Sequence, residues 1–378
     1  MYSITGLNPQ TETPVVVTIR DGLIDSIAAS TETSEQWLSP GFVDLQVNGY
    51  GGADANADGV DSDAIIDLTE KMIAGGVTTY LPTIITASEE RICAALGAVA
   101  AARRNSKLVA GCVPFAHVEG PHISPLDGYR GAHPIDDVRP PDLVEFARWQ
   151  AASNGIVGMV TLSPHYSESG EYIRILSAQG VHCSIGHTHA SSEQVRSAVN
   201  AGAVLSTHLG NGIAGMIQRH VNPIWPQLSD DRLTAMFIAD GHHLPSETIK
   251  AMVRAKGVSR AILVSDAVAL AGLPAGVYDT PVGGRAELHP NGRLSLAGTE
   301  FLAGAVLPLK DGIARATAMT GISLGDSVRM ATENPGRFAG GAGLLQVGKP
   351  ADLVLFRVVG GGESLSIDRV IVKGTEWS

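Results

Sequence analysis

Four side chains that could do acid–base or metal chemistry stand where apolar, strand-like runs of the sequence end. Glu119 lies in AHVEGP, His187 in SIGHT, His208 in STHLGN and Asp266 in LVSDA. Eleven of the twelve histidines also fall within one third of the chain. Because the carboxyl ends of parallel strands meet at one edge, we expect these residues to share a site although they lie far apart in sequence.

The residue types in this set predict a metal centre. Two imidazoles and one carboxylate, with a fourth position open for water, are the ligands of a catalytic zinc or similar divalent ion. We therefore expect Glu119, His187 and His208 to hold one ion, Zn²⁺ first, with Fe²⁺, Co²⁺ or Mn²⁺ as alternatives. Taken singly, each also fits a buried ion pair or a core histidine. Asp266 is expected to take a proton from water and pass it to a leaving amine, with a helix N-cap as the alternative.

Other polar residues near these strand ends receive weaker interpretations. His117 precedes Glu119 by two residues, so it is expected on the same side but one layer deeper in the core. His122 and His189 follow strand ends and are expected in exposed loops or as supports for the ligands. The glycine-rich NGYGG at residues 48–52 is not GxGxxG and opens no helix, which disfavours a dinucleotide site.

Eight apolar runs alternate with helical patterns through the middle of the chain. This alternation predicts a closed (β/α)₈ barrel over residues 41–339, with an open doubly wound sheet as the alternative. The runs are Phe42–Gln46, Val77–Thr83, Cys112–Glu119, Ile156–Ser163, Val181–His187, Val204–His208, Ala235–Asp240 and Ala261–Asp266.

Helix-start signals support the alternation. Thr86-x-x-Glu89 and Ser191-x-x-Gln194 have the spacing of a capping box, in which two side chains satisfy the free N–H groups of the first turn. They predict helices over residues 91–104 and after residue 191. A helical period over residues 64–73 predicts another.

Both ends of the chain are β-rich. The expected strands are Pro14–Ile19 and Leu23–Ile27 near the N-terminus, and Ala351–Val358 and Leu365–Val372 near the C-terminus. They predict a small β-sandwich domain formed by residues 1–40 together with residues 340–378.

Composition limits the partners and the compartment. The net charge of −11 disfavours nucleic acid and requires a local cationic group for any anionic substrate. The three cysteines lack CxxC spacing, so neither a disulfide framework nor a zinc knuckle is expected. The longest apolar runs are about half a bilayer span, and the first residues lack the pattern of a signal peptide. We therefore expect a cytoplasmic protein without a membrane partner.

Eight motifs, in order along nearly the whole chain, resemble the N-acetylglucosamine-6-phosphate deacetylases of the amidohydrolase superfamily. They are LSPGFVDLQVNGYGG, GGVTTYLPTIIT, HVEGPHIS with RGAHP, GHTHA, THLGNG, ADGHH, SDAVALAG and GKPADLVLF. The resemblance implies a (β/α)₈ barrel with a small β-sandwich from both chain ends. It also implies hydrolysis of the acetamide of an amino-sugar phosphate to an amine and acetate.

The resemblance also assigns roles by position. It implies that Glu119, His187 and His208 bind the metal, that Asp266 is the catalytic acid and base, and that His133 contacts the substrate near the scissile carbonyl. Further residues would bind the sugar phosphate, in some members with the arginine reaching across a homodimer interface. These residues are Gln46, His133, Asn211, Gly212, Arg219 and His243.

Departures from the family pattern bear on metal number and substrate. Gln46 and Asn48 occupy the places of a usual His-x-His pair, and no lysine lies between Lys107 and Lys250, so one metal is expected rather than a bridged pair. After Arg219 the chain reads His-Val-Asn instead of the usual Glu-Pro-Gly. Gly210, His189 and the segment Ser163-Pro164-His165 are further departures.

These departures keep other functions open. One alternative is deacylation of N-acetylgalactosamine 6-phosphate or of a non-phosphorylated N-acyl amine. Another is a barrel without catalytic activity, retained for oligomeric binding. The sequence does not decide the sugar epimer, the native metal or the subunit in which Arg219 acts.

Overall fold

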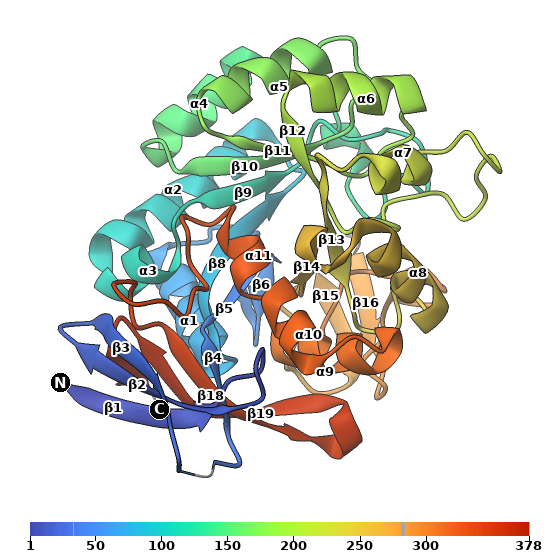
Figure 1. Cartoon of the computed structure of the whole chain (residues 1–378). Helices are drawn as coiled ribbons and strands as arrows, with labels where there is room; N and C mark the ends of the chain where they lie inside the picture. The colour runs from blue at the N-terminus through green and yellow to red at the C-terminus, as the bar shows by residue number, and fades with distance from the viewer. Residues whose placement is uncertain (33, 281–283, 378) are drawn as a thin grey trace.

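The computed structural model describes residues 1–32, 34–280 and 284–377. Its centre is an eight-stranded parallel sheet with the order β14-β13-β12-β11-β10-β9-β8-β5 (Figure 1). The two outer strands of this order meet, because the Asp266 N–H donates to the Gln46 carbonyl at 3.0 Å and Val47 bridges Ala267. The predicted (β/α)₈ barrel is therefore confirmed. Its strands are β5 (Phe42–Val47), β8 (Val77–Ile85), β9 (Ala116–Glu119), β10 (Val157–Leu162), β11 (His182–Ile185), β12 (Ala203–Ser206), β13 (Thr234–Ile238) and β14 (Ala261–Val264).

Helices surround the barrel (Figure 1). The strands are apolar on both faces because one face packs inside the barrel, where Leu45, Met159 and Met236 meet, and the other packs against the helices. The helices are α1 (Ser62–Ala74), α2 (Glu89–Asn105), α3 (Lys107–Cys112), α4 (Leu143–Ser153), α5 (Ser169–Ala178), α6 (Ser192–Ala201), α7 (Ile224–Ser229), α8 (Ser246–Lys256), α9 (Leu309–Thr320), α10 (Leu324–Met330) and α11 (Glu333–Gly336), with short 3₁₀ turns η1 (Ile135–Asp137), η2 (Val258–Arg260) and η3 (Gly360–Gly362).

Two helix predictions have different outcomes. The capping box at Ser191 and Gln194 is present at the start of α6. The one at Thr86 is wrong, because Ser88 caps α2 through the Arg91 N–H, and the Thr86 hydroxyl lies 2.8 Å from His133 Nδ1. The expected strand from Cys112 is also shorter at its start, because α3 ends at Cys112.

Both chain ends form one seven-stranded sheet with the order β20-β19-β18-β4-β1-β2-β3. The sheet curls until the Ile24 N–H donates to the Lys349 carbonyl, so one apolar core of Val17, Leu38 and Leu353 lies inside it. This confirms a small β unit built from both ends. Its strands are β1 (Tyr2–Leu7), β2 (Pro14–Arg20), β3 (Leu23–Ala29), β4 (Trp37–Pro40), β18 (Leu353–Val359), β19 (Ser364–Val372) and β20 (Thr375–Trp377).

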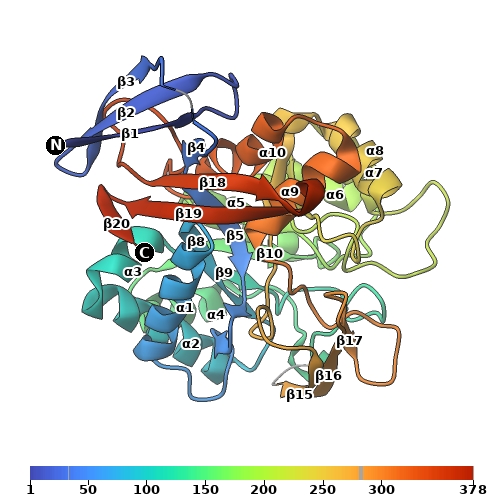
Figure 2. The ribbon, with the colours of Figure 1, turned by 90° about the horizontal axis from the view of Figure 1, so that it is seen from below.

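Two smaller sheets were not anticipated. A three-stranded antiparallel sheet of β15 (Gly276–Thr280), β16 (Gly284–Leu288) and β17 (Leu294–Leu296) lies between β14 and α9 in the sequence and away from the terminal sheet (Figure 2). A two-stranded sheet of β6 (Gly49–Tyr50) and β7 (Ala53–Asp54) follows β5. In the described part of the chain, no helix combines the length and apolarity needed to cross a bilayer.

Candidate active site

The three predicted metal ligands meet at the carboxyl end of the barrel. Glu119 is the last residue of β9, while His187 and His208 each stand two residues beyond a strand, β11 and β12 respectively. His208 Nε2 lies 2.9 Å from Glu119 Oε1, and His187 Nε2 lies 3.5 Å from the same oxygen and 3.1 Å from His208 Nε2. All three side chains are buried. The structure thus brings together residues that 89 positions of sequence separate.

The spacing of these donor atoms fits a tetrahedral ion. Ligands at 2.0–2.1 Å from zinc stand about 3.3 Å from one another, close to the separations in this cluster. The His187 Nδ1–H donates to the Tyr129 carbonyl at 2.9 Å, so in the neutral ring the Nε2 lone pair is available to a metal beside Glu119 and His208. His133 also offers a nitrogen to a group with Glu119 and His187, whose ligand atoms lie within 4.8 Å of one another. The donor set therefore suits a divalent metal.

The charges of this cluster are strongly coupled. Burial opposes the negative charge of Glu119, but hydrogen bonds and positive charge from the protonated rings of His187 and His208 outweigh it and hold the pKa of Glu119 well below its usual range. Burial likewise opposes a positive charge on His208, yet the hydrogen bond and charge of Glu119 raise the pKa of His208. The carboxylate is thus ionised and ready to bind a cation.

Three site residues have left-handed backbone conformations. The φ angles are 45° at His187, 25° at His208 and 49° at Asp266, a region that residues other than glycine rarely adopt. Such conformations persist where surrounding structure holds them, and they are common at functional sites. Here each turns the chain sharply after a strand, which directs the side chain toward the barrel mouth.

Glycines make room for the ring of His187. Gly212 and Gly131 both have positive φ, and a Cβ on Gly212 would stand 2.7 Å from His187 Nδ1. A Cβ on Gly131 would stand 3.2 Å from His187 Cε1. Gly212, predicted as a substrate contact, is therefore also a packing residue of the metal centre.

Asp266, two residues beyond β14, lies beside the cluster rather than in it. Asn48 Nδ2 donates to Asp266 Oδ1 at 2.8 Å. Burial and then the negative charge of Glu119 raise the pKa of Asp266, against the opposing effects of His208, His243 and Asn48, to a net value of about 6. A carboxyl group whose pKa is close to neutral can both accept and return a proton.

Gln46 and His133 contact the cluster from two sides. Gln46 is fully buried, and its Nε2 donates to Glu119 Oε1 at 2.9 Å. The ring of His133 stands edge-on to that of His187, with centroids 4.4 Å apart, and its Nδ1 bonds to Thr86. Burial lowers the pKa of His133 to about 3, and the neighbouring His187 contributes. His133 is therefore a neutral imidazole, which can donate a hydrogen bond to a carbonyl oxygen.

The residues predicted to hold the sugar phosphate are only partly assembled. His243 Nδ1 lies 2.7 Å from Asp240 Oδ2, and Asn211 Nδ2 donates to the His208 carbonyl at 3.2 Å. Arg219 is exposed on the 209–223 loop, which protrudes beyond α7 (Figure 1). Within the described ranges of this chain, its guanidinium makes no hydrogen bond or ion pair with the other predicted site residues. Arg219 is thus the one predicted site residue that this chain does not bring to the centre.

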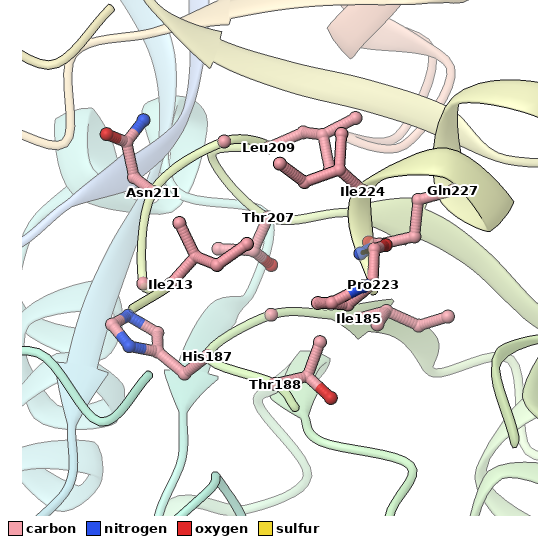
Figure 3. Close-up of a pocket in the computed structure, with 13 residues that line it drawn as sticks. Ile185, His187, Thr188, Thr207, Leu209, Asn211, Ile213, Pro223, Ile224 and Gln227 are labelled. Atoms are coloured by element: carbon pink, nitrogen blue, oxygen red, sulfur yellow. Dashed lines mark hydrogen bonds between the residues drawn. The ribbon is translucent and has the colours of Figure 1, made fainter. Parts of the chain in front are cut away.

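A small pocket opens beside His187 (Figure 3). Apolar side chains of Leu209, Ile213 and Ile224 line it, and His187 and Asn211 stand on its other side. The loops that follow β11 and β12 form its walls. An uncharged group such as a methyl is the chemistry that this lining suits.

Sequence reasoning missed two buried aspartates. Asp44 accepts the backbone N–H groups of Gln46 and Ser265, at 3.2 Å for each, and joins β5 to β14 next to Asp266. Burial raises the pKa of Asp44 to about 7. Asp240 pairs with His243, whose hydrogen bond outweighs burial and lowers the pKa of Asp240 to about 2. The motif ADGHH carried a signal for the second, because an aspartate three residues before a histidine can turn back to it.

Three further histidines with sequence-based expectations lie near the site. His117 lies inside the barrel as expected, with Nδ1 donating to the Leu45 carbonyl and Nε2 2.7 Å from Thr161 Oγ1. His122 is buried against Trp149 rather than exposed. His189 lies 2.7 Å from Ser124 Oγ and packs on His165, so two departures from the family pattern touch each other.

The chain matches the model of the amidohydrolase family over residues 37–376. The chain belongs to the amidohydrolase family. An N-acetylglucosamine-6-phosphate deacetylase of Bacillus subtilis (strain 168) is 33% identical over 325 residues, which are 84% of this chain and 80% of that protein. An N-acetylgalactosamine-6-phosphate deacetylase of Escherichia coli O157:H7 is 31% identical over 363 residues, 94% of this chain and 93% of that protein.

Solved structures agree with these relatives. The crystal structure of the Mycobacterium smegmatis N-acetyl-D-glucosamine-6-phosphate deacetylase has a TM-score of 0.88 at 28% identity, and the match covers both chains completely. An aspartate-to-alanine mutant of that enzyme, in complex with N-acetyl-D-glucosamine-6-phosphate, has a TM-score of 0.87 at 28% identity over 98% of this chain and 97% of that chain. The resemblance drawn from the motifs is confirmed.

Proposed function

We propose that this amidohydrolase is a metal-dependent deacetylase that converts N-acetylglucosamine 6-phosphate to glucosamine 6-phosphate and acetate. The observation that carries the proposal is the meeting of Glu119, His187 and His208 within 3.5 Å, with Asp266 beside them. The relatives named above support the choice of an N-acetylated sugar phosphate as substrate.

The side chains have separate tasks in this reaction. A divalent ion, Zn²⁺ by preference, held by the three ligands would act as a Lewis acid that acidifies water and polarises the acetamide carbonyl. Asp266 removes a proton from the attacking water and then gives one to the nitrogen, so the C–N bond breaks and its electron pair stays on the amine. The neutral His133 donates a hydrogen bond to the oxygen as it gains charge.

We propose that the phosphate end of the site is completed by a second subunit of a homodimer. Arg219 lies on the protruding loop, beside Met216 and Val221, whose side chains are 92% and 61% exposed. Several exposed apolar side chains on one loop would be covered if a second subunit packed against it. The guanidinium can hold two phosphate oxygens at once, which a chain of net charge −11 needs for an anionic substrate.

Mixed subunits test this arrangement. Asp266→Asn is expected to be nearly inactive and Arg219→Ala to lose about ten- to a hundredfold in kcat/KM for the phosphorylated sugar. If the arginine comes from the partner, a dimer of one subunit of each kind has one site with both residues intact. Activity that appears on mixing and exchange supports an arginine from the partner. If the mixture stays as inactive as its components, Arg219 acts within its own subunit or not at all.

N-acetylgalactosamine 6-phosphate is the second candidate substrate, because the relative that acts on it matches 94% of this chain. The deciding experiment is acetate release from both sugar phosphates and from free N-acetylglucosamine, with metal content measured on the same sample before and after chelation. The proposal requires acetate from a phosphorylated sugar that chelation abolishes and added metal restores. A metal-loaded protein that deacetylates none of them would contradict it.

Two further expectations stay proposals. One is the division into residues 41–339 and the paired ends 1–40 and 340–378, which the separate strand orders of the two main sheets support. The other is a cytoplasmic location, which fits the three free cysteines.

A further inference from the structure

Two amide side chains lie at the carboxyl end of β5, where Gln46 belongs to the strand and Asn48 is the first residue after it. Gln46 is fully buried and Asn48 is 7% exposed. Gln46 donates to the metal ligand Glu119, and Asn48 donates to Asp266. Each of these two amides therefore donates a hydrogen bond to one carboxylate of the site.

These contacts fix how the two amides are turned. A carboxylate accepts hydrogen bonds, so the NH₂ group of each amide must face it, and the carbonyl oxygen must face the other way. Gln46 Oε1 and Asn48 Oδ1 are both buried, and neither has a hydrogen-bond partner within residues 1–32, 34–280 and 284–377. A buried oxygen left without a donor costs about 1–3 kcal/mol, so such an atom calls for a ligand or a water.

The position of Asn48 is set independently of its side chain. Its backbone N–H donates to the Ala267 carbonyl at 2.8 Å, next to Asp266, and the Asp266 N–H donates back to the Gln46 carbonyl. Asn48 and Asp266 are thus joined by both backbone and side chain. A substrate nitrogen within hydrogen-bond reach of Asp266 would therefore also be close to the amide group of Asn48.

The proposed substrate supplies one donor at that place. A secondary acetamide has a single N–H, on the nitrogen that must receive a proton before the amine can leave. We propose that Asn48 Oδ1 accepts this N–H, so that Asn48 recognises the scissile amide and aims its nitrogen at Asp266. The inference rests on the proposed function, since it assigns a residue to the same reaction.

The contact would act at one step. When water has added to the carbonyl carbon, the nitrogen becomes pyramidal and its lone pair is free. With its N–H bound to Asn48, the lone pair is directed to the proton on Asp266, and the C–N bond then breaks with its electron pair on nitrogen. An ester has no such N–H and would leave the Asn48 oxygen without a donor, so the site should select amides over esters.

Two stable analogues separate this contact from catalysis. Both are sugar 6-phosphates with a methylphosphonyl group on carbon 2, joined through N–H in one and through oxygen in the other. Their affinities for the metal-loaded enzyme require no proton transfer. We expect the wild-type enzyme to bind the N–H analogue about tenfold more tightly, as one buried hydrogen bond implies.

Variants then assign the preference to a residue. Asn48→Ala, and Asn48→Leu, which keeps the side-chain shape, should bring the ratio of the two affinities close to one while metal content stays complete. Asn211→Ala is the matched control, because it should weaken both analogues equally. Equal affinities in the wild type, or a ratio that survives both Asn48 variants, would overturn the inference while leaving the deacetylase function intact. Wild-type protein that binds neither analogue and releases no acetate would refute the function itself.

Discussion

The strand-end cluster and the 209–223 loop hold the two halves of the proposed site, and they are built in opposite ways. Glu119, His187 and His208 are buried and fixed by backbone turns, by glycines and by hydrogen bonds to one another. Arg219 is exposed on a loop outside the barrel. The difference teaches that one chain positions the residues proposed to break the bond, whereas it leaves the residue proposed to bind the phosphate at its surface, where a second subunit could complete the site.

The largest expected effect is at the buried end of this comparison. His208→Ala removes one of three ligands, so we expect loss of bound metal and a fall of activity to background. Metal content by elemental analysis and acetate release on the same preparation check this. A variant that keeps a full complement of metal would show that His208 is not a ligand.

Replacing the proton carrier should separate binding from chemistry. Asp266→Asn keeps the shape and the contact with Asn48, so metal stays bound while kcat falls by a factor on the order of 10²–10⁴. The measurement is kcat with parallel metal analysis. An unchanged kcat would remove Asp266 from the mechanism.

Asp44 tests how a buried carboxyl group beside the site affects the free energy of unfolding. Its pKa is about 7 in the folded protein against a usual 3.8, so the folded state holds an extra proton between these values and loses stability as the pH rises through them. Asp44→Asn has no such proton. Relative to the wild type, the free energy of unfolding of the variant should therefore rise by on the order of 4 kcal/mol between pH 4 and pH 8.

Urea unfolding of both proteins, with metal removed throughout, measures this difference. Parallel dependence of the two proteins on pH would mean that Asp44 carries no raised pKa.

The smallest effect is expected on the loop. Arg219→Ala removes a charge-assisted contact of about 1.5–3 kcal/mol, so kcat/KM for a phosphorylated sugar should fall about ten- to a hundredfold. The metal content and the rate with free N-acetylglucosamine should not change. Arg196→Ala, an exposed arginine on α6, is the matched control. Equal losses with the phosphorylated and free sugars would refute a phosphate contact.

The sequence predicted the residues at the strand ends better than it predicted contacts between distant segments. Glu119, His187, His208 and Asp266 were predictable because apolar runs mark the strands and parallel strands end at one edge. Thr86 was assigned to a helix cap because its spacing to Glu89 matched one, whereas Ser88 competes for that role and Thr86 binds His133. Neither local spacing nor periodicity states which of two hydroxyls a distant histidine will contact.

Local spacing and periodicity also could not predict the small sheet or the contacts between distant side chains. The antiparallel sheet of β15, β16 and β17 is short and buries only one face, so its strands lack the strong apolar signal of the barrel. The carboxyl group of Asp44 in an apolar strand is explained by the Ser265 N–H, which donates to it from the carboxyl end of β14. The departures at His165 and His189 likewise became one feature only when their rings were found in contact.

The curled terminal sheet has a practical consequence. The Tyr2 hydroxyl donates to the Gly374 carbonyl at 2.9 Å, so the first and last described strands of the chain lie side by side (Figure 1). They do so near the entry of β5 into the barrel, not at the carboxyl ends of the strands. An affinity tag, a fluorescent reporter or a covalent tether attached at either end would therefore leave the mouth of the enzyme open to small molecules, and both ends can be fixed to the same support.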